Sequence, residues 1–452
     1  MSKLKESFIL NVAFPLADKL MGTCAMKWYR QICKMNTWSR DEITNWQNSQ
    51  LQAFVKHAYN HTVYYKRVFD ELGLRPEDIR CAEDLKKLPV VTKDIANAHF
   101  DELAPDNLAQ IKCRLGKTGG TTGEPMRYYC DENVWGYVTA AKIFHWKKAG
   151  YRYGDAFVAL GSSSLFAKKP SLVRRIYDKI RNEVPMNSVN LTDELCEKYV
   201  RQIKKQKIRF IYGYAASIYI LTKYVAKKNI DLTQIEAVFT TSENLTDAYR
   251  ELMEKTYKCH VMDCYGARDA GITAYEVGRG SYHVGYNAVV EVINEIAPNT
   301  GTVLTTNFLN YSFPLIRYQF GDEAELAVNV PENEYNGRVI RKVIGRTSDV
   351  MRLGNGHSLT ATGFSMIMKE FDVVAFDFNK VGETEVALRI QPIDGKYDMN
   401  QEETIRKTIH RYIGEDCKLN IEYVDHFEPL KNGKRRYFMN DVLEVGCAPE
   451  IR

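Results

Sequence analysis

The sequence predicts an α/β protein with a large N-terminal domain of layered sheets and helices and a small, mobile α+β C-terminal domain. The chain has 452 residues, of which 45% are hydrophobic and 26% charged, and it is longer than one compact core usually supports. Apolar runs of strand length alternate with charged helical segments, and the composition shifts after GRTSDVMRLGNG. We therefore expect domains at 1–346 and 347–452, with the hinge between Gly345 and Gly354.

The elements follow from local patterns along the chain. Helical periodicity in LQAFVKHAYNHTVYYKRVF predicts a helical subregion at about 1–97. Beyond it, DAFVALGSS, IRFIYGY and IEAVFTTSE are predicted as strands, separated by helices near 193–206 and in SIYILTKYVAKK. The later runs HVGYNAVVEVI, GTVLTTN and EAELAVNV predict a second, meandering antiparallel sheet. In the small domain, VVAFDFNKV, EVALRIQPI and LNIEYVDHF are predicted as strands, with a helix at 401–413.

The charge distribution limits the possible partners. A net charge of +5 is small for a chain of this size and argues against nucleic acid binding. The first forty residues hold seven basic and two acidic side chains, which equals the whole excess. Their apolar run from Phe8 to Ala17 is broken by Asn11 and Pro15 and is too short to cross a bilayer. The segment 1–40 therefore either packs on the protein's own body or makes peripheral contact with an anionic membrane.

The ten cysteines are scattered through the chain, without the dense spacing of a disulfide-stapled domain. We therefore expect a reducing, cytoplasmic setting. Cys259 and Cys264 are close neighbours, with His260 beside them, but no second pair follows nearby. This spacing favours thiols near a strand over a zinc site.

The strongest local feature is KTGGTTGEP, from Lys117 to Pro125. Glycines allow close backbone approach, and backbone N–H groups and threonine hydroxyls can line a phosphate. No Gly-Lys-Ser/Thr follows at the required spacing, so the segment is not a Walker loop. By itself it fits either a phosphate cradle or an ordinary hairpin turn.

Further motifs follow in order, namely TTSENL at 240–245, YGARDAG at 265–271, FPLIRYQFGD at 313–322, VIGRTSD at 343–349 and PLKNGKRR at 429–436. In that order, from about Trp38 onward, the chain resembles the adenylate-forming superfamily of acyl-CoA synthetases and nonribosomal adenylation domains. Within it, LQAFVKHAYNHTVYYKRVF, DLKKLPVVTKDIA and IYGY are similar to phenylacetate-CoA ligases and CapK-like proteins of capsular polysaccharide gene clusters. The resemblance implies activation of a small carboxylic acid by ATP and Mg²⁺ to acyl-AMP, with coenzyme A as the expected acceptor.

The resemblance also implies roles for individual residues. The phosphates of ATP would lie against Thr118, Gly119, Gly120, Thr121, Thr122 and Gly123. The rest of the nucleotide would contact Ser242, Glu243, Tyr265, Gly266, Asp322 and Arg346. Asp269 would bind Mg²⁺, and Lys434 on the small domain would stabilise the transition state of adenylation. The acid would lie beside Tyr212, Gly213, Tyr214 and Ala267.

Four positions depart from the family pattern. Glu124 stands where lysine is common, Asp269 where glutamate is usual, QFGD lacks the arginine-threonine dipeptide, and GRTSD lacks one aspartate. Some phenylacetate-CoA ligases bind zinc through cysteines after the tyrosine-glycine motif. Here AYEVGRGSYHVG offers Glu276 and His283 but no cysteine, so we expect no structural zinc.

Three hypotheses remain open at this point. The leading one is two-step ligation, in which the acid is adenylated and then passed to a thiol. The second is transfer of AMP or of the acyl group to a polysaccharide precursor. The third is a nucleotide-binding protein without catalysis, which the four departures support.

Overall fold

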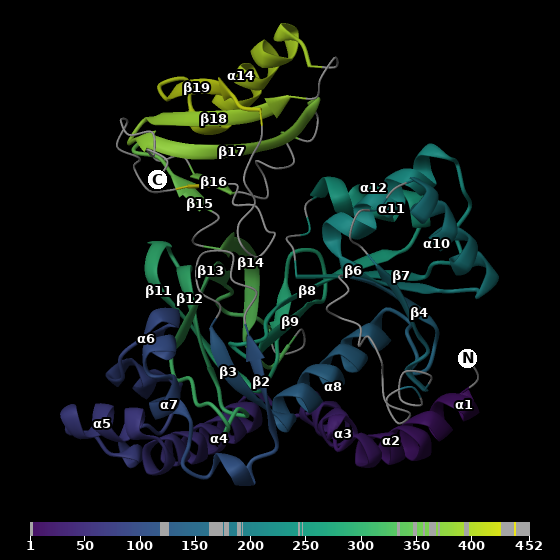
Figure 1. The fold of residues 1–452 in the computed structure, drawn as a ribbon. Helices are drawn as coiled ribbons and strands as arrows, with labels where there is room; N and C mark the ends of the chain where they lie inside the picture. The colour runs from purple at the N-terminus through teal and green to yellow at the C-terminus, as the bar shows by residue number, and fades with distance from the viewer. Residues whose placement is uncertain are drawn as a thin grey trace, which may run out of the picture. The chain divides into compact units, whose positions relative to one another are not determined.

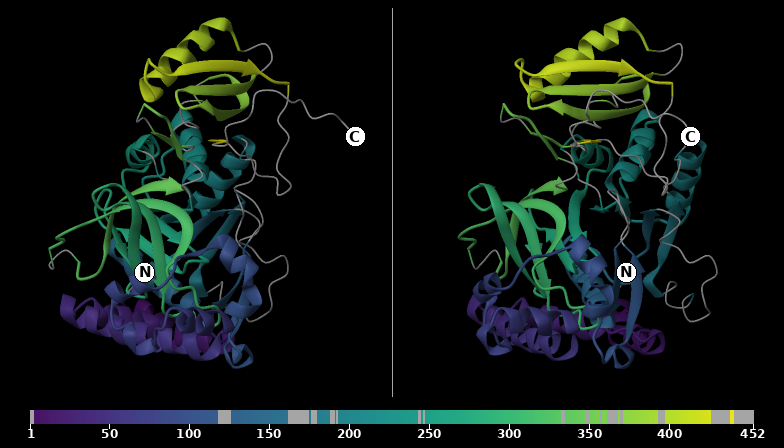
Figure 2. Two further views of the ribbon diagram at one scale, coloured as in Figure 1. Left: turned by 90° about the vertical axis from the view of Figure 1, so that its left-hand side faces the viewer. Right: turned by 60° about the vertical axis from the view of Figure 1, so that its left-hand side comes forward.

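The computed structural model of the chain describes residues 3–117, 126–161, 175, 180–187, 191, 193–242, 245, 247–331, 335–346, 350–355, 358–360, 368, 371–392, 397–425 and 438–439. The chain divides into two compact units (Figures 1 and 2). The first contains Met1–Thr118, Met126–Phe320 and Ala324–Val343, and the second contains Gly119–Pro125, Gly321–Glu323 and Ile344–Arg452.

The first unit opens with helices, as the sequence predicts. Helix α4 begins at a capping box, in which the Glu42 N–H donates to Ser39 Oγ at 3.2 Å and the Ser39 N–H donates to Glu42 Oε2 at 2.8 Å. Within the described residues, no helix combines the length and apolar composition of a bilayer span. The elements are α1 (Lys3–Phe8), the π-helical turn η1 (Ile9–Ala13), α2 (Phe14–Met21), α3 (Ala25–Met35), α4 (Arg40–His61), α5 (Val63–Glu71), α6 (Lys93–Ala98) and α7 (Phe100–Leu103), with short 3-10 turns at Pro76–Asp78, Ala82–Lys87 and Leu108–Gln110.

Twelve of the described strands form the main sheet, in the order β11-β12-β13-β14-β10-β9-β8-β7-β6-β4-β5 with β1 paired to β13. The strands from β4 to β8 pair in parallel, whereas β8-β9, β9-β10 and β10-β14 are antiparallel. The strands are β1 (Val91–Thr92), β4 (Phe157–Gly161), β5 (Glu183–Asn187), β6 (Phe210–Tyr214), β7 (Ala237–Thr241), β8 (His260–Ala267), β9 (Ile272–Glu276), β10 (Tyr282–Val284), β11 (Ala288–Ala297), β12 (Thr300–Asn307), β13 (Tyr318–Leu326) and β14 (Val339–Arg346). The accompanying helices are α8 (Glu132–Lys148), α10 (Asp193–Lys205), α11 (Ala215–Lys227) and α12 (Asp247–Tyr257).

One expectation about this sheet is wrong. The antiparallel runs after residue 280 were expected to form a separate sheet, but β11, β12 and β13 belong to the same hydrogen-bonded series as β4 to β8. Strands β9, β10 and β14 continue the ladder between the two halves. The change from parallel to antiparallel pairing therefore takes place within one sheet.

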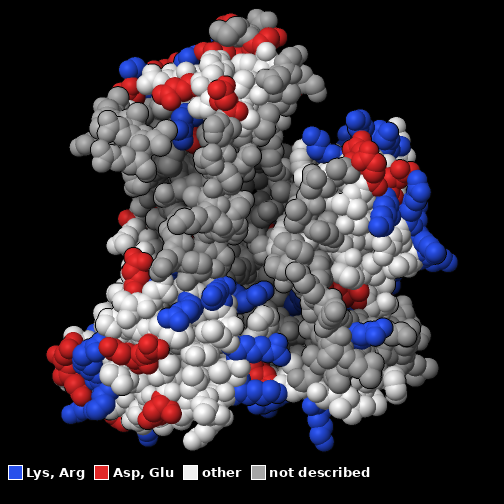
Figure 3. Space-filling model, viewed as in Figure 1, with Lys and Arg blue, Asp and Glu red and all other residues white. Residues whose placement is uncertain are grey.

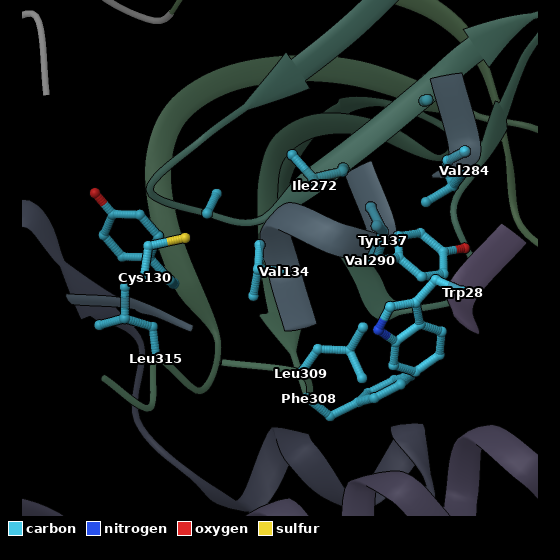
Figure 4. Close-up of a cluster of buried hydrophobic side chains, with 14 of the residues drawn as sticks. Trp28, Cys130, Val134, Tyr137, Ile272, Val284, Val290, Phe308, Leu309 and Leu315 are labelled. Atoms are coloured by element: carbon cyan, nitrogen blue, oxygen red, sulfur yellow. The ribbon is translucent and has the colours of Figure 1, made fainter. Parts of the chain in front are cut away.

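Helix α8 lies in the core of the first unit. This burial explains why the helix is apolar around much of its circumference. Its Val134 and Tyr137 side chains lie among Trp28, Val290 and Phe308 (Figure 4). The Trp28 and Tyr137 rings meet edge to face with centroids 5.5 Å apart. The Tyr286 N–H donates to the Tyr137 hydroxyl oxygen at 2.6 Å, so the buried hydroxyl has a partner.

The second unit contains the small α+β fold that the sequence predicts. Strands β17 (Val373–Gly382) and β18 (Glu385–Pro392) form a hairpin, and helix α14 (Met399–Ile413) connects β18 to the parallel strand β19 (Lys418–Tyr423). Strand β20 (Phe438–Met439) pairs with β17, and β15 (Val350–Arg352) pairs with β16 (Ser358–Thr360). The core contains Phe378, Leu388, Ile405 and Ile409.

Candidate active site

The carboxyl ends of three parallel strands bring the predicted acid- and nucleotide-binding residues together. The strand register aligns Tyr214 of β6 with Thr241 of β7, and Thr241 with Cys264 of β8. Ser242 and Tyr265 follow directly, so Tyr214, Ser242 and Tyr265 stand at one edge of the sheet. In open α/β sheets this edge is the usual place for ligands.

Gly213 allows β6 to lie close to its neighbour at this edge. A Cβ atom built on Gly213 would stand 2.1 Å from the backbone carbonyl oxygen of Leu160 on β4. No heavier side chain fits there without displacing a strand. The glycine of the IYGY motif is thus explained by packing, independently of any ligand.

The side chains of Tyr212 and Lys142 lie together near the end of β6. The Lys142 Nζ lies 5.0 Å from the centroid of the Tyr212 ring and 5.2 Å from that of Trp146, within cation-π range. Burial, with a further contribution from the positive charge of Arg181, lowers the pKa of the Lys142 ammonium to about 8. Lys142 was not predicted from the sequence, where its only signal is a charged residue inside the apolar run VWGYVTAAKIFHW.

Ser242 adopts an unusual backbone conformation directly after β7. Its φ of 65° lies in the left-handed region, which residues other than glycine seldom occupy. The residue is exposed. Such a conformation is a form of backbone strain that proteins often keep at functional sites, and the assignment of Ser242 to a nucleotide site stays a prediction.

Asp269 follows β8 in the turn to β9 and is held by a residue from a distant strand. The Tyr318 hydroxyl of β13 donates to Asp269 Oδ2 at 2.9 Å. Upstream of this turn, Gly266 and Ala267 pair with Thr273 and Ile272 of β9. A carboxylate fixed by a buried tyrosine is suited to a role that requires a defined position, such as metal coordination.

A buried ion pair between α12 and β9 holds β8 in place. Arg250 of α12 and Glu276 of β9 are 8% and 3% exposed, and Arg250 Nη2 lies 2.7 Å from both carboxylate oxygens. The Asp263 N–H donates to the same carboxylate at 3.0 Å. The Asp263 side chain accepts in turn from Thr240 Oγ1 at 2.5 Å and from the Tyr282 hydroxyl at 2.9 Å. The network ties β7, β8, β9 and β10 together just below the candidate site.

Two predicted nucleotide-binding residues belong to the second compact unit. Asp322 lies on β13 and is 9% exposed, and it follows Gly321, whose φ is 92°. Arg346 ends β14, and its side chain is outside the described part of the structure. The predicted residues Thr118, Gly119, Gly120, Thr121, Thr122, Gly123, Glu243 and Lys434 also lie outside the described residues.

The strands that flank the glycine-rich segment carry exposed positive charge. Strands β2 (Cys113–Lys117) and β3 (Arg127–Asp131) form an antiparallel hairpin, and Arg114, Lys117 and Arg127 are exposed on it. Figure 3 shows basic side chains gathered over this part of the first unit. Such charge attracts phosphate groups.

The possible metal ligands of the AYEVGRGSYHVG segment have other partners. Glu276 is in the buried ion pair, and the His283 ring stacks on Tyr335 with centroids 4.0 Å apart. Burial lowers the pKa of the His283 imidazole to about 4. Across the described residues, no group of three or more His, Cys, Asp or Glu side chains is arranged to hold a metal ion.

A cavity of about 520 Å³ lies away from the strand edge. Its lining includes His57, Lys112, Asp131, Glu132 and Tyr311, and none of its lining residues comes from β6, β7 or β8. It therefore does not coincide with the predicted acid site.

Solved structures establish the class to which this fold belongs. The 2-hydroxyisobutyryl-CoA ligase in its postadenylation state, in complex with R3-HIB-AMP, matches with a TM-score of 0.67 and 17% identity over 90% of this chain and 91% of that one. The same ligase in the thioesterification state gives a TM-score of 0.56 and 17% identity. The fold is that of an adenylate-forming acid-CoA ligase, which confirms the predicted fold class.

Curated relatives make the resemblance more specific. No family model matches the chain. Protein CapK of Staphylococcus aureus is 23% identical over 412 residues, which cover 89% of this chain and 90% of CapK. Phenylacetate-coenzyme A ligase of Pseudomonas putida is 25% identical over 334 residues, which cover 70% and 73% of the two chains. These relatives confirm the resemblance to the adenylate-forming superfamily and to its acid-CoA ligases.

Proposed function

We propose that the protein activates a carboxylic acid with ATP and transfers the acyl group to coenzyme A. In the first step a carboxylate oxygen attacks the α-phosphorus of ATP and pyrophosphate leaves. In the second step the thiolate of coenzyme A attacks the acyl carbon and AMP leaves. The observation that carries the proposal is the register of β6, β7 and β8, which aligns Tyr214 with Thr241 and Thr241 with Cys264 and so brings Ser242 and Tyr265 to the same edge as Tyr214.

The nucleotide would be held from several elements. Tyr265 and Ser242 would contact the adenine, and Asp322 would accept hydrogen bonds from the ribose hydroxyls. The basic hairpin of β2 and β3 supports a phosphate site in the segment between them. Arg346, which ends β14, would contact the ribose or phosphates, and Lys434 of the C-terminal unit would act on the α-phosphate.

The acid would lie beside Tyr212 and Lys142, next to Gly213, Tyr214 and Ala267. An aromatic face favours an apolar or aromatic body on the substrate. The partly buried Lys142 ammonium favours a polar or anionic group on the same molecule. These two features support a substituted acid that carries a hydroxyl, carbonyl or second carboxyl group.

Asp269 fits the role of a Mg²⁺ ligand. Tyr318 donates to Oδ2, so the carboxylate has a defined position and would keep lone pairs for the ion. Carboxylate oxygen is the ligand type that Mg²⁺ prefers. When bound, the ion neutralises charge on the phosphates, while the protein's part is to hold Asp269 in place.

Pyrophosphate exchange tests the first step. The purified chain is incubated with ATP, Mg²⁺ and labelled pyrophosphate, together with single acids from a panel that includes hydroxylated, aromatic and dicarboxylic members. We expect exchange that depends on one class of acid, and an acyl-CoA by mass spectrometry when coenzyme A is added. ATP binding without exchange across the panel contradicts adenylation and favours a non-catalytic nucleotide-binding protein.

The similarity to CapK favours a second candidate function. CapK matches 89% of this chain, whereas the phenylacetate-coenzyme A ligase of Pseudomonas putida matches 70%. The alternative is transfer of the acyl or adenylyl group to a polysaccharide precursor. Exchange without acyl-CoA formation, together with an acylated or adenylylated sugar in the product mixture, would select this alternative.

The Asp322→Ala variant tests the nucleotide site by binding alone. Loss of a hydrogen bond to a charged group costs about 1.5 to 3 kcal/mol, so the dissociation constant for ATP is expected to rise about tenfold or more. Titration calorimetry measures this change, and circular dichroism verifies the fold. An unchanged affinity in a folded variant removes Asp322 from the nucleotide site.

A further inference from the structure

The N-terminal helices present a row of large apolar side chains to solvent. Phe8, Val12, Leu16 and Leu20 are 60%, 50%, 57% and 61% exposed, and they recur at every fourth residue through α1, η1 and α2. Exposed hydrophobic side chains scattered singly are ordinary, whereas a continuous row marks a contact surface. We refer to these four residues as the apolar row.

The π-helical turn helps to keep the row on one face. In an α-helix, four residues overshoot a full turn by about 40°, so three such steps would spread the row over about 120°. Between Phe8 and Val12 the chain is π-helical, and in a π-helix each residue turns less about the axis because the hydrogen bond closes a larger ring. The π-helical turn therefore reduces the angle over which the apolar row spreads around the helix axis.

The opposite face of the same helices is anchored to the body of the first unit. Phe14 is fully buried, and its ring stacks on Tyr153 with centroids 4.2 Å apart. Asp18 is 5% exposed and accepts from the Met26 N–H at 2.7 Å and from Thr23 Oγ1 at 2.5 Å. Packing on the protein's own body, one of the two uses expected from the sequence, therefore accounts for one face and leaves the apolar row uncovered by the described residues.

The accessible charge on this segment is positive. Both acidic residues face inward, since Glu6 lies 3.5 Å from Lys147 Nζ with a side chain only 13% exposed, and Asp18 is buried. Lys19 beside the row and Lys27, Arg30 and Lys34 along one face of α3 are exposed, and none of them forms an ion pair with a described carboxylate. Figures 1 and 2 show α1, α2 and α3 along the same end of the first unit.

We propose that the apolar row and these four cations form a docking surface for an anionic lipid bilayer. The helices would lie in the plane of the interface, with the apolar row inserted among the headgroups and acyl chains and the cations at the anionic headgroups. This inference does not depend on the proposed function.

A bilayer fits this surface better than a protein partner. The row is about 18 Å long for its thirteen residues, and four side chains offer much less than the roughly 800 Å² per partner of a standard protein interface. A second copy of the chain would also bring like charges face to face, which is unfavourable. A lipid surface requires no shape complementarity and supplies the opposite charge.

Vesicle flotation of the full chain tests the proposal. We expect binding to vesicles of phosphatidylcholine with one third phosphatidylglycerol to be at least tenfold stronger than binding to phosphatidylcholine alone, and to weaken at high salt. A variant of the apolar row should bind the phosphatidylglycerol vesicles at least tenfold more weakly than the parent chain. A variant of the cations should bind both vesicle types equally weakly. The row variant is Val12→Thr/Leu16→Gln/Leu20→Gln, and the charge variant is Lys27→Gln/Arg30→Gln/Lys34→Gln.

Matched controls separate this surface from general stickiness. Val63→Gln/Leu72→Gln removes two apolar side chains that are 65% and 49% exposed on another part of the unit, and Lys198→Gln/Lys204→Gln/Lys205→Gln removes three exposed charges from α10. Both should bind like the parent chain. If circular dichroism shows that the row variant does not fold, the charge variant and the salt dependence of binding test the proposal instead.

Three results overturn the proposal. One is the absence of flotation with phosphatidylglycerol vesicles, and another is equal loss in the control variants. The third is found by size exclusion with light scattering, if the parent chain is a dimer that the row variant dissociates. That outcome would assign the surface to self-association instead.

Discussion

Replacing Glu276 by alanine is expected to lower the free energy of unfolding by about 3 to 5 kcal/mol, because it removes the close partner of a buried guanidinium and leaves only the Glu254 carboxylate, 3.9 Å away. Arg250 is 8% exposed, and both oxygens of the Glu276 carboxylate lie 2.7 Å from its Nη2. The same carboxylate accepts from the backbone N–H of Asp263 and Gly280, which would also lose their partner. Urea denaturation of the folded variant measures the change.

Two comparisons isolate the loss of the buried Arg250–Glu276 pair as the cause. The double variant Arg250→Met/Glu276→Leu should recover part of the stability, since replacing both members of a buried pair by apolar residues is often nearly neutral. Asp247→Ala removes the nearer of the two carboxylates beside the exposed Arg279, 3.0 Å away, and should cost less than about 1 kcal/mol. A loss for Glu276→Ala no larger than that of Asp247→Ala would show that the pair contributes little to holding β8.

The strands and helices of both units were largely predictable because their signals are local. The run IRFIYGY predicts β6 and IEAVFTTSE predicts β7, and their observed ends at Tyr214 and Thr241 place the following residues at the edge that usually binds ligands in open α/β sheets. The continuity of the main sheet was not predictable. It depends on pairing between β10 and β14, whose residues Tyr282 and Ile340 are far apart in sequence.

The candidate site was predictable only where a motif names the residue. YGARDAG identifies Tyr265 and Asp269, but nothing near Asp269 in the sequence indicates that Tyr318 will donate to it from another strand. Lys142 was missed for the same reason, because a single lysine in a helix acquires meaning only when Tyr212 is brought beside it. Side-chain partners that come from distant elements are set by topology, which local periodicity does not specify.

Lys434→Ala is expected to reduce the rate of acyl-AMP formation by about a hundredfold to a thousandfold, the usual loss for one preorganised charge contact in a transition state. Lys434 lies outside the described residues, so its role rests on the PLKNGKRR motif. If it meets the α-phosphate only during adenylation, ATP affinity should change little. Pyrophosphate exchange measures the first step, and calorimetry measures ATP binding.

The two half-reactions distinguish a catalytic lysine from a structural one. Transfer to coenzyme A from a supplied acyl-adenylate should be nearly unaffected in Lys434→Ala, since the supplied adenylate bypasses the step in which Lys434 is proposed to act. Equal loss in both half-reactions would indicate a defect in folding or domain docking. Lys431→Ala, three residues away in the same basic segment, is the matched control. If it alone slows exchange, the charge that acts on the α-phosphate comes from Lys431 and not from Lys434.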